Sequence, residues 1–189
     1  MTLMELETGI RRMPIRAIHI FTLAYITIIC WLCGHLEVTA SNIVKDIEWE
    51  EGMKIPENHA TEEERVALAI TLEGEGGGLE SLTELSGIGW AIINRVDSNE
   101  YPNDVVKVVS QKKQFGGYSK DGSYSERSYW MANDVLSRYE REKAGETDVG
   151  RTLPKDYLYF QGDGKHNYFS IERDGTPYTW SYVLSPYGT

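Results

Sequence analysis

Cysteine is scarce in this sequence of 189 residues, which contains only Cys30 and Cys33. Both lie inside one apolar run near the N-terminus. Their C-x-x-C spacing would indicate redox chemistry or a metal site in a folded domain, but a segment that sits in lipid or is removed provides neither. The remainder of the chain has no disulfide framework and no cysteine nucleophile, so a hydrophobic core must stabilise it.

Positive charge is also in short supply, with 19 lysines and arginines against 29 acidic residues and a net charge of -10. Sequence-independent binding to nucleic acid needs the opposite sign, so no nucleic-acid partner is expected. The hydrophobic share of 41% and the aromatic share of 11% are enough for an ordinary globular core. Wholesale disorder is therefore excluded.

Several kinds of catalytic motif are missing. After residue 40 the only histidines are His59 and His166, and there is no H-E-x-x-H pair, so neither a metal nor a cofactor is expected. No serine occupies a nucleophile elbow. The glycines at 76–78 follow a predicted helix rather than a strand and lack a lysine, so they do not form a phosphate loop. Of these kinds of catalytic group, only the carboxylates of Asp and Glu remain as candidates.

An apolar run over residues 17–34 follows three arginines and precedes the small-residue sequence Val38-Thr39-Ala40. This pattern is typical of a secretory signal peptide, and we assign residues 1–40 to it. The run is about 18 residues long, the lower limit for a membrane-spanning helix, so an uncleaved signal-anchor is the alternative. In both cases the rest of the protein is secreted or membrane-anchored, acts outside the cytoplasm and touches the membrane only through this segment.

The exported part begins with an acidic stretch. Residues 41–60 lack apolar periodicity, which together with their charge predicts a solvated linker. Thr61 and Glu64 then form a capping box, the signature of a helix start. A folded domain is therefore expected over residues 61–189.

This domain is predicted to be α+β, mainly helical with a small C-terminal β region. Apolar residues at three-and-four spacing indicate helices, and an aromatic-rich stretch interrupted by Gly-Asp turns indicates strands. The expected elements are helices over about 61–73, 81–96, 101–111 and 125–143, a small hairpin around 120–123, and strands with turns over 156–184.

Glu73 is the carboxylate that we expect to carry chemistry, because it ends an apolar stripe at the end of the first predicted helix. The negative end of the helix dipole and the apolar surroundings both raise a carboxyl pKa. A partly protonated acid is what cleavage of a glycosidic bond needs. The alternative is that Glu73 frays into solvent. Glu75, Glu80 and Glu84 are nearby acids that we expect in loops or on exposed faces.

Aromatic side chains are dense in the segments placed around a cleft. Sugar rings bind by stacking on flat side chains with polar rims, although each ring taken singly is more typical of a core. The set consists of Tyr118, Tyr124, Tyr157, Tyr159, Phe160, Tyr168 and Phe169.

Residues 66–169 resemble the SleB-type cell wall hydrolases, which include spore-cortex-lytic enzymes. The resemblance rests on landmarks in a fixed order rather than on one specific motif. They are Glu73-Gly74 for the family's E-A-R-G-E, Asn94-Arg95-Val96 for N-R-V, Tyr101 to Val105 for its phenylalanine-proline segment, Gln114-Phe115 for Q-F, Tyr157 to Phe160 for A-L-Y-Y, and Gly164 to Phe169 for G-G-H-x-F-Y.

The sequence departs from the family pattern in three places. Glu75 stands where the family has an arginine, and the family's second glutamate falls near Gly77 in a loop about two residues longer. The last predicted strand also continues past Phe169, through Tyr178 to Tyr187, further than is expected for the family.

The resemblance implies a lysozyme-like α+β domain that cleaves the glycan strand of peptidoglycan, with the family's catalytic glutamate at Glu73. By this resemblance we favour a monomeric lytic transglycosylase acting between N-acetylmuramic acid and N-acetylglucosamine. The expected substrate-binding residues are Gln114, Phe115, Tyr118, Tyr159, His166 and Tyr168. A hydrolysing muramidase with a second carboxylate and a non-catalytic peptidoglycan-binding module are the alternatives.

Overall fold

The computed structural model describes residues 47–177 and 185–187. Its elements in chain order are α3 (Glu62–Gly76), α4 (Leu82–Asp97), α5 (Val105–Val109), α6 (Glu126–Lys143), β1 (Tyr159–Gly162) and β2 (Asn167–Ser170). The predicted signal segment, residues 1–40, lies outside the described residues. In the part of the chain that is described, no helix is long and apolar enough to cross a membrane.

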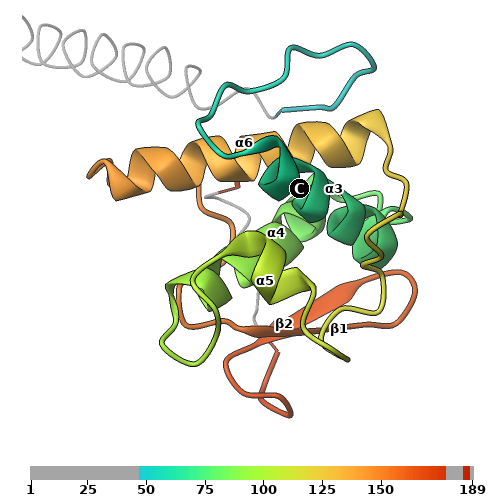
Figure 1. Cartoon of the computed structure of the whole chain (residues 1–189), viewed down its shortest axis with the longest axis vertical. Helices are drawn as coiled ribbons and strands as arrows, with labels where there is room; N and C mark the ends of the chain where they lie inside the picture. The colour runs from blue at the N-terminus through green and yellow to red at the C-terminus, as the bar shows by residue number, and fades with distance from the viewer. Residues whose placement is uncertain (1–46, 178–184, 188–189) are drawn as a thin grey trace, which may run out of the picture. The chain divides into compact units, whose positions relative to one another are not determined.

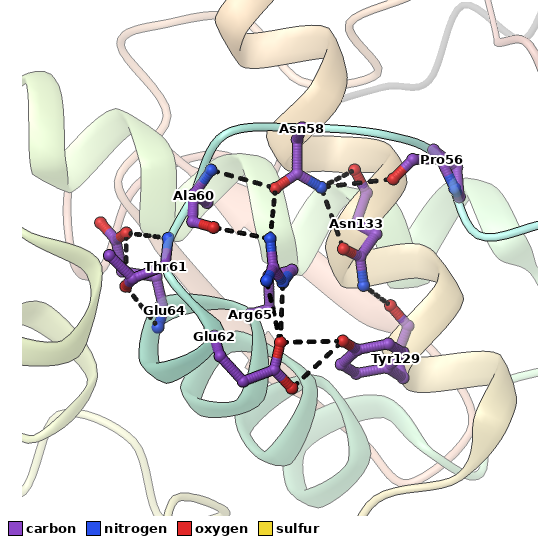
Figure 2. Close-up of polar contacts among 9 residues, drawn as sticks. All are labelled: Pro56, Asn58, Ala60, Thr61, Glu62, Glu64, Arg65, Tyr129 and Asn133. Carbon is purple, nitrogen blue, oxygen red and sulfur yellow. Dashed lines mark hydrogen bonds and ion pairs between the residues drawn. The ribbon is translucent and has the colours of Figure 1, made fainter.

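Helices α3, α4 and α6 begin where the sequence predicts, because each has a side chain that caps its first turn. At α3 the Thr61 hydroxyl accepts from the Glu64 backbone N–H, and the Glu64 carboxylate accepts from the Thr61 N–H at 2.8 Å (Figure 2). Ser81 and Ser125 cap α4 and α6 in the same manner. The third helix is shorter than expected, since Asp104 is its cap.

Helix α4 forms the centre of the core. Leu85, Ile88, Trp90, Ile92 and Ile93 on this helix are all fully buried. In Figure 1, α6 runs along one side of the domain and the β1–β2 hairpin lies on the other, with α3 and α4 between them. The observed architecture is therefore mainly helical with a small antiparallel sheet of two strands, as predicted.

The β1–β2 hairpin is tightly registered, with Tyr159 opposite Ser170 and Gly162 opposite Asn167. The Asp163 carboxylate holds its turn by accepting hydrogen bonds at 2.8 Å from the backbone N–H groups of residues 165 and 166. This turn carries His166 and so determines where that side chain lies.

The hairpin predicted around residues 120–123 is wrong. Only a turn forms there, in which the Gly122 N–H donates to the Ser119 carbonyl at 2.8 Å. Helix α6 is capped at Ser125, which leaves no length for a returning strand. A Cβ at Gly122 would lie 2.6 Å from the Ile70 side chain, so the turn packs directly on α3.

The acidic segment before α3 is solvated on one side only along its described part. Ile47, Trp49, Met53 and Ile55 are partly buried against the core. They occupy odd-numbered positions, while the acidic residues at 48 and 50 between them are exposed; Glu51, in a turn, is the exposed exception to this alternation. An alternation with a period of two is the signal of a half-buried extended segment, and it is present in the sequence.

Polar contacts fix the end of this segment to the domain (Figure 2). The Asn58 amide donates to Asn133 on α6 at 2.9 Å, and Arg65 on α3 donates to the Ala60 carbonyl at 2.6 Å. Tyr129 on α6 donates to the Glu62 carboxylate at 3.2 Å. Residues 56–65 are thus tied to both α3 and α6, and the boundary drawn at residue 61 stays a prediction.

Candidate functional site

Glu73 lies in the last turn of α3, beside the first turn of α6. Its Oε2 accepts from the Ser125 backbone N–H at 3.1 Å, from the Ser125 hydroxyl at 2.6 Å and from the Ser128 hydroxyl at 2.6 Å. Ser125 is the N-cap of α6. The carboxylate is therefore at the positive end of the α6 dipole as well as the negative end of the α3 dipole.

The pKa of Glu73 is lowered from its usual value, whereas the sequence predicted that it would be raised. Burial is the largest single influence and does raise this pKa, but hydrogen bonds from Ser125 and Ser128 and the positive charge of Arg127 outweigh it. Helix α3 taken alone would raise this pKa. The donors that reverse the direction come from α6, 52 and 55 residues further along the chain.

A small hollow of about 130 Å³ opens beside Glu73. We call it the Glu73 hollow; it is lined by residues 73–79 and by Gly162, Gly164, His166 and Asn167 of the β1–β2 hairpin. A Cβ at Gly77 would lie 2.7 Å from Glu73 Oε1. The glycine therefore leaves this oxygen uncovered, and a larger side chain does not fit there without movement.

Glycine also permits the loop after α5 to approach α3. A Cβ at Gly74 would lie 2.3 Å from the Gly117 carbonyl oxygen, so the two backbones are in direct contact. Beside them the Glu75 carboxylate accepts from the Gly117 N–H at 2.7 Å. Glu75, which stands in place of the family's arginine, thus holds this loop against the end of the helix.

A second, larger hollow of about 590 Å³ adjoins the first. We call it the His166 hollow; Gly78, Gly164 and His166 line both, and Glu80, Ser81, Glu84 and Lys165 complete the second. Because they share these lining residues, the two hollows lie side by side, and together they form a depression near the start of α4 and the hairpin turn.

Glu84 and His166 form a pair in the lining of the His166 hollow. Glu84 Oε1 lies 2.9 Å from His166 Nδ1, and Glu84 Oε2 accepts from the Asn167 N–H at 2.9 Å. The hydrogen bond and charge of Glu84 raise the pKa of His166. Glu84 is only 8% exposed, so the expectation that it lies on an exposed face is wrong, while the His166 ring remains largely open to solvent.

Three of the remaining predicted residues gather around Arg95 instead of Glu73. Arg95 is buried, donates to the Gln114 side chain at 3.1 Å, and packs over the rings of Phe115 and Tyr159 at 4.8 and 5.5 Å. Phe115 is 6% exposed and belongs to the core. The Q-F and N-R-V landmarks therefore meet in one packing cluster.

The other two predicted residues differ in exposure. Tyr118 is partly buried against the core. Tyr168 is 45% exposed, and its hydroxyl donates to Asp163 at 2.8 Å. Of the seven site residues predicted from the sequence, Glu73 and His166 are the two that line the Glu73 hollow. Among the described residues no cluster of His, Cys, Asp and Glu side chains is suited to hold a metal ion.

Comparison with known proteins identifies the family. The cell wall hydrolase family matches residues 80–176, more than half of the chain. The match begins after Glu73 and includes the Glu84–His166 pair and the hairpin. No curated protein and no solved structure matches the chain. The chain therefore belongs to the SleB-type family of cell wall hydrolases, enzymes whose substrate is peptidoglycan.

Proposed function

We propose that this protein cleaves the glycan strand of peptidoglycan as a lytic transglycosylase, with Glu73 as its general acid and base. The observation that carries the proposal is the unequal environment of the two Glu73 oxygens. Oε2 accepts three hydrogen bonds from α6, while Oε1 lies beside Gly77 in the Glu73 hollow. A carboxyl group held by one oxygen and open at the other is suited to transfer a proton.

In the proposed reaction Glu73 Oε1 first donates a proton to the oxygen that links N-acetylmuramic acid to N-acetylglucosamine. The bond from that oxygen to the muramic C1 breaks. The Glu73 carboxylate then accepts the proton of the muramic C6 hydroxyl, whose oxygen bonds to C1 and closes a 1,6-anhydro ring. Glu73 ends protonated as it began, and no water is consumed. A nucleophile within the substrate benefits from proximity, so one carboxylate is sufficient.

The lowered pKa of Glu73 means that the free protein holds this group ionised at neutral pH. A sugar that fills the Glu73 hollow excludes water from Oε1. It strengthens the influence of burial, which already acts to raise the pKa. We infer that substrate binding supplies the protonated form.

A hydrolysing muramidase is the second candidate, because Glu84 is a buried carboxylate beside the same depression. Such an enzyme needs the second carboxylate to activate a water molecule. Both Glu84 oxygens are already engaged, one with His166 and the other with the Asn167 N–H. This occupation favours the transglycosylase.

Peptidoglycan lies outside the cytoplasmic membrane, and family membership accordingly indicates an extracytoplasmic location. We propose that residues 1–40 direct export, as a cleaved signal peptide or a retained anchor. A monomer is sufficient for the proposed reaction, since Glu73 and the residues that line its hollow come from one chain.

The test is digestion of purified peptidoglycan by the full chain in mild detergent, followed by mass analysis of the fragments. Anhydro ends, lighter than reducing ends by one water, support the transglycosylase; reducing ends identify the muramidase. E73Q should release no fragments, while E63Q, an exposed glutamate on the same helix, should release them at the wild-type rate. If neither the wild type nor E73Q releases fragments but both bind the wall, the protein is a binding module.

A further inference from the structure

Glu84 is a buried carboxylate that the proposed chemistry does not use. It lies in the first turn of α4, where its own N–H donates to the Ser81 cap at 3.2 Å, and it is only 8% exposed. The positive end of a helix dipole favours a carboxylate. Burial of a charge is nevertheless costly unless hydrogen bonds and an opposite charge compensate it. A carboxylate at this position therefore depends on its partners.

Both side-chain partners of Glu84 belong to the β1–β2 hairpin. Oε1 lies 2.9 Å from His166 Nδ1, and Oε2 accepts from the Asn167 N–H at 2.9 Å. The His166 backbone is held separately, because its N–H donates to the Asp163 carboxylate at 2.8 Å. One carboxylate of α4 thus holds the ring of His166 and the backbone of the next residue, which gives the ring a fixed orientation.

The contact with Glu84 determines which ring nitrogen a ligand meets. A carboxylate accepts hydrogen bonds, so Nδ1 carries the proton that is directed at Glu84. The other nitrogen, Nε2, has no hydrogen-bond partner among the described residues. The His166 side chain is 62% exposed and lines both the Glu73 hollow and the His166 hollow, the second together with the charged residues Glu80 and Lys165. Nε2 therefore belongs to an accessible ring that shares a hollow with Glu73.

The neighbours of His166 favour its charged form. Glu84 is the main cause of its raised pKa; Asp163 acts in the same direction, while burial and Lys165 oppose it. The pKa of Glu73 is lowered instead, from an ordinary value that is already below that of histidine. In the free protein His166 is therefore charged wherever Glu73 is protonated, and both ring nitrogens are then donors.

We propose that Glu84 is a positioning residue that acts through His166: it fixes the ring so that protonated Nε2 donates a charge-assisted hydrogen bond to an oxygen of the substrate bound at Glu73. Such bonds are roughly twice as strong as neutral ones. A neutral His166 keeps its remaining proton on Nδ1, so Nε2 ceases to donate when the ring titrates, and substrate affinity falls as pH rises. The inference rests on the proposed function, because it takes the substrate to bind in the Glu73 hollow.

The experiment measures how the affinity for soluble peptidoglycan glycan fragments depends on pH, by calorimetric titration of the full chain in mild detergent. All proteins carry E73Q, which should prevent cleavage and removes the titration of Glu73 itself. E84Q and H166Q are added singly to this parent. The matched control is E140Q, because Glu140 likewise contacts a histidine ring, His59 Nδ1 at 3.0 Å, and accepts from the backbone N–H of that histidine at 2.6 Å. Neither residue of this second pair lines the Glu73 or His166 hollow.

In the parent, affinity should fall about tenfold as pH rises through the pKa of His166, the loss of one charge-assisted hydrogen bond. E84Q should shift this fall to lower pH, in step with the His166 titration followed by NMR, and H166Q should abolish it. E140Q should behave like the parent. Glutamine at position 84 can still accept from the Asn167 N–H, so a purely structural role of Glu84 would leave the midpoint of the fall unchanged.

Three results overturn the inference. They are a parent that does not bind the fragments, a parent affinity that does not change with pH, and a midpoint that E84Q leaves in place. H166Q keeps the test decisive if E84Q fails to fold, because its side chain is exposed; a fall that persists in folded H166Q belongs to another group and overturns the inference as well. Fragment release by the wild-type chain is measured separately, so the proposed function stands or fails independently.

Discussion

The substitution S128A tests whether the charge state of Glu73 controls the reaction. Ser128 is fully buried and donates to Glu73 Oε2 at 2.6 Å. Its own backbone N–H is bound by the Ser125 hydroxyl, so the α6 cap remains when the Ser128 hydroxyl is removed. Because this hydroxyl lowers the pKa of Glu73, its loss should raise that pKa.

The size of the effect follows from the hydrogen bond that is lost. A hydrogen bond to a charged group contributes about 1.5–3 kcal/mol. Glu73 is only partly buried, so water replaces part of the interaction and the lower end, about 1.5 kcal/mol, applies. That free energy corresponds to about a tenfold change in the acid dissociation constant of the carboxyl group.

The assay is the pH dependence of fragment release from peptidoglycan by S128A and the wild type. The alkaline limb should move to higher pH in S128A, because the first step needs protonated Glu73. The lowered wild-type pKa also stabilises the folded protein above the unfolded-state pKa, and this stabilisation is lost as pH falls through the folded-state value. S128A should lose less stability on acidification. S137A, on the same helix, is the control. Superimposable pH profiles from a folded S128A would refute the assignment of Glu73.

Two further predictions concern the residues around the site. In E84Q the pKa of His166 should fall, because Glu84 is the main cause of its raised value. The titration is followed by the NMR shift of the His166 ring, with His59 as an internal reference. An unchanged His166 titration would contradict the pairing. G74A should lower the free energy of unfolding, measured in urea titrations, by about 1–3 kcal/mol, because its Cβ would lie 2.3 Å from the Gly117 carbonyl oxygen. G78A is the control and should leave this free energy unchanged, because its Cβ would meet no atom within 4 Å. Equal stability of the two variants would contradict the close backbone contact.

Features governed by neighbouring residues were predictable from the sequence. Thr61 and Glu64 lie three positions apart and cap α3 as expected. The turn at residues 162–164 also forms where its glycine and aspartate indicate, and it joins β1 to β2. In each case the interaction that fixes the structure lies within a few residues of the signal.

Features governed by distant residues were not predictable in this way. The Glu73 carboxylate is bound by Ser125 and Ser128 of another helix, and no local pattern reports that contact. Phe115 was expected to bind substrate from the resemblance alone, and no local pattern indicates that its ring packs in the core against Arg95. The segment at 47–55 is a different case. Its alternation of apolar and polar residues is present in the sequence and indicates packing against the domain, but its acidic composition led to the prediction of a solvated linker.

The difference between the two oxygens of Glu73 has a consequence for the direction in which a glycan strand binds. Oε2 already accepts three hydrogen bonds from Ser125 and Ser128, so in the proposed reaction the proton is transferred from the side that faces Gly77. In that reaction the proton is delivered from one direction only. Under the proposed function, a strand bound with its reducing end reversed presents a different oxygen to that side, so the proposal requires the glycan to bind with one chain polarity.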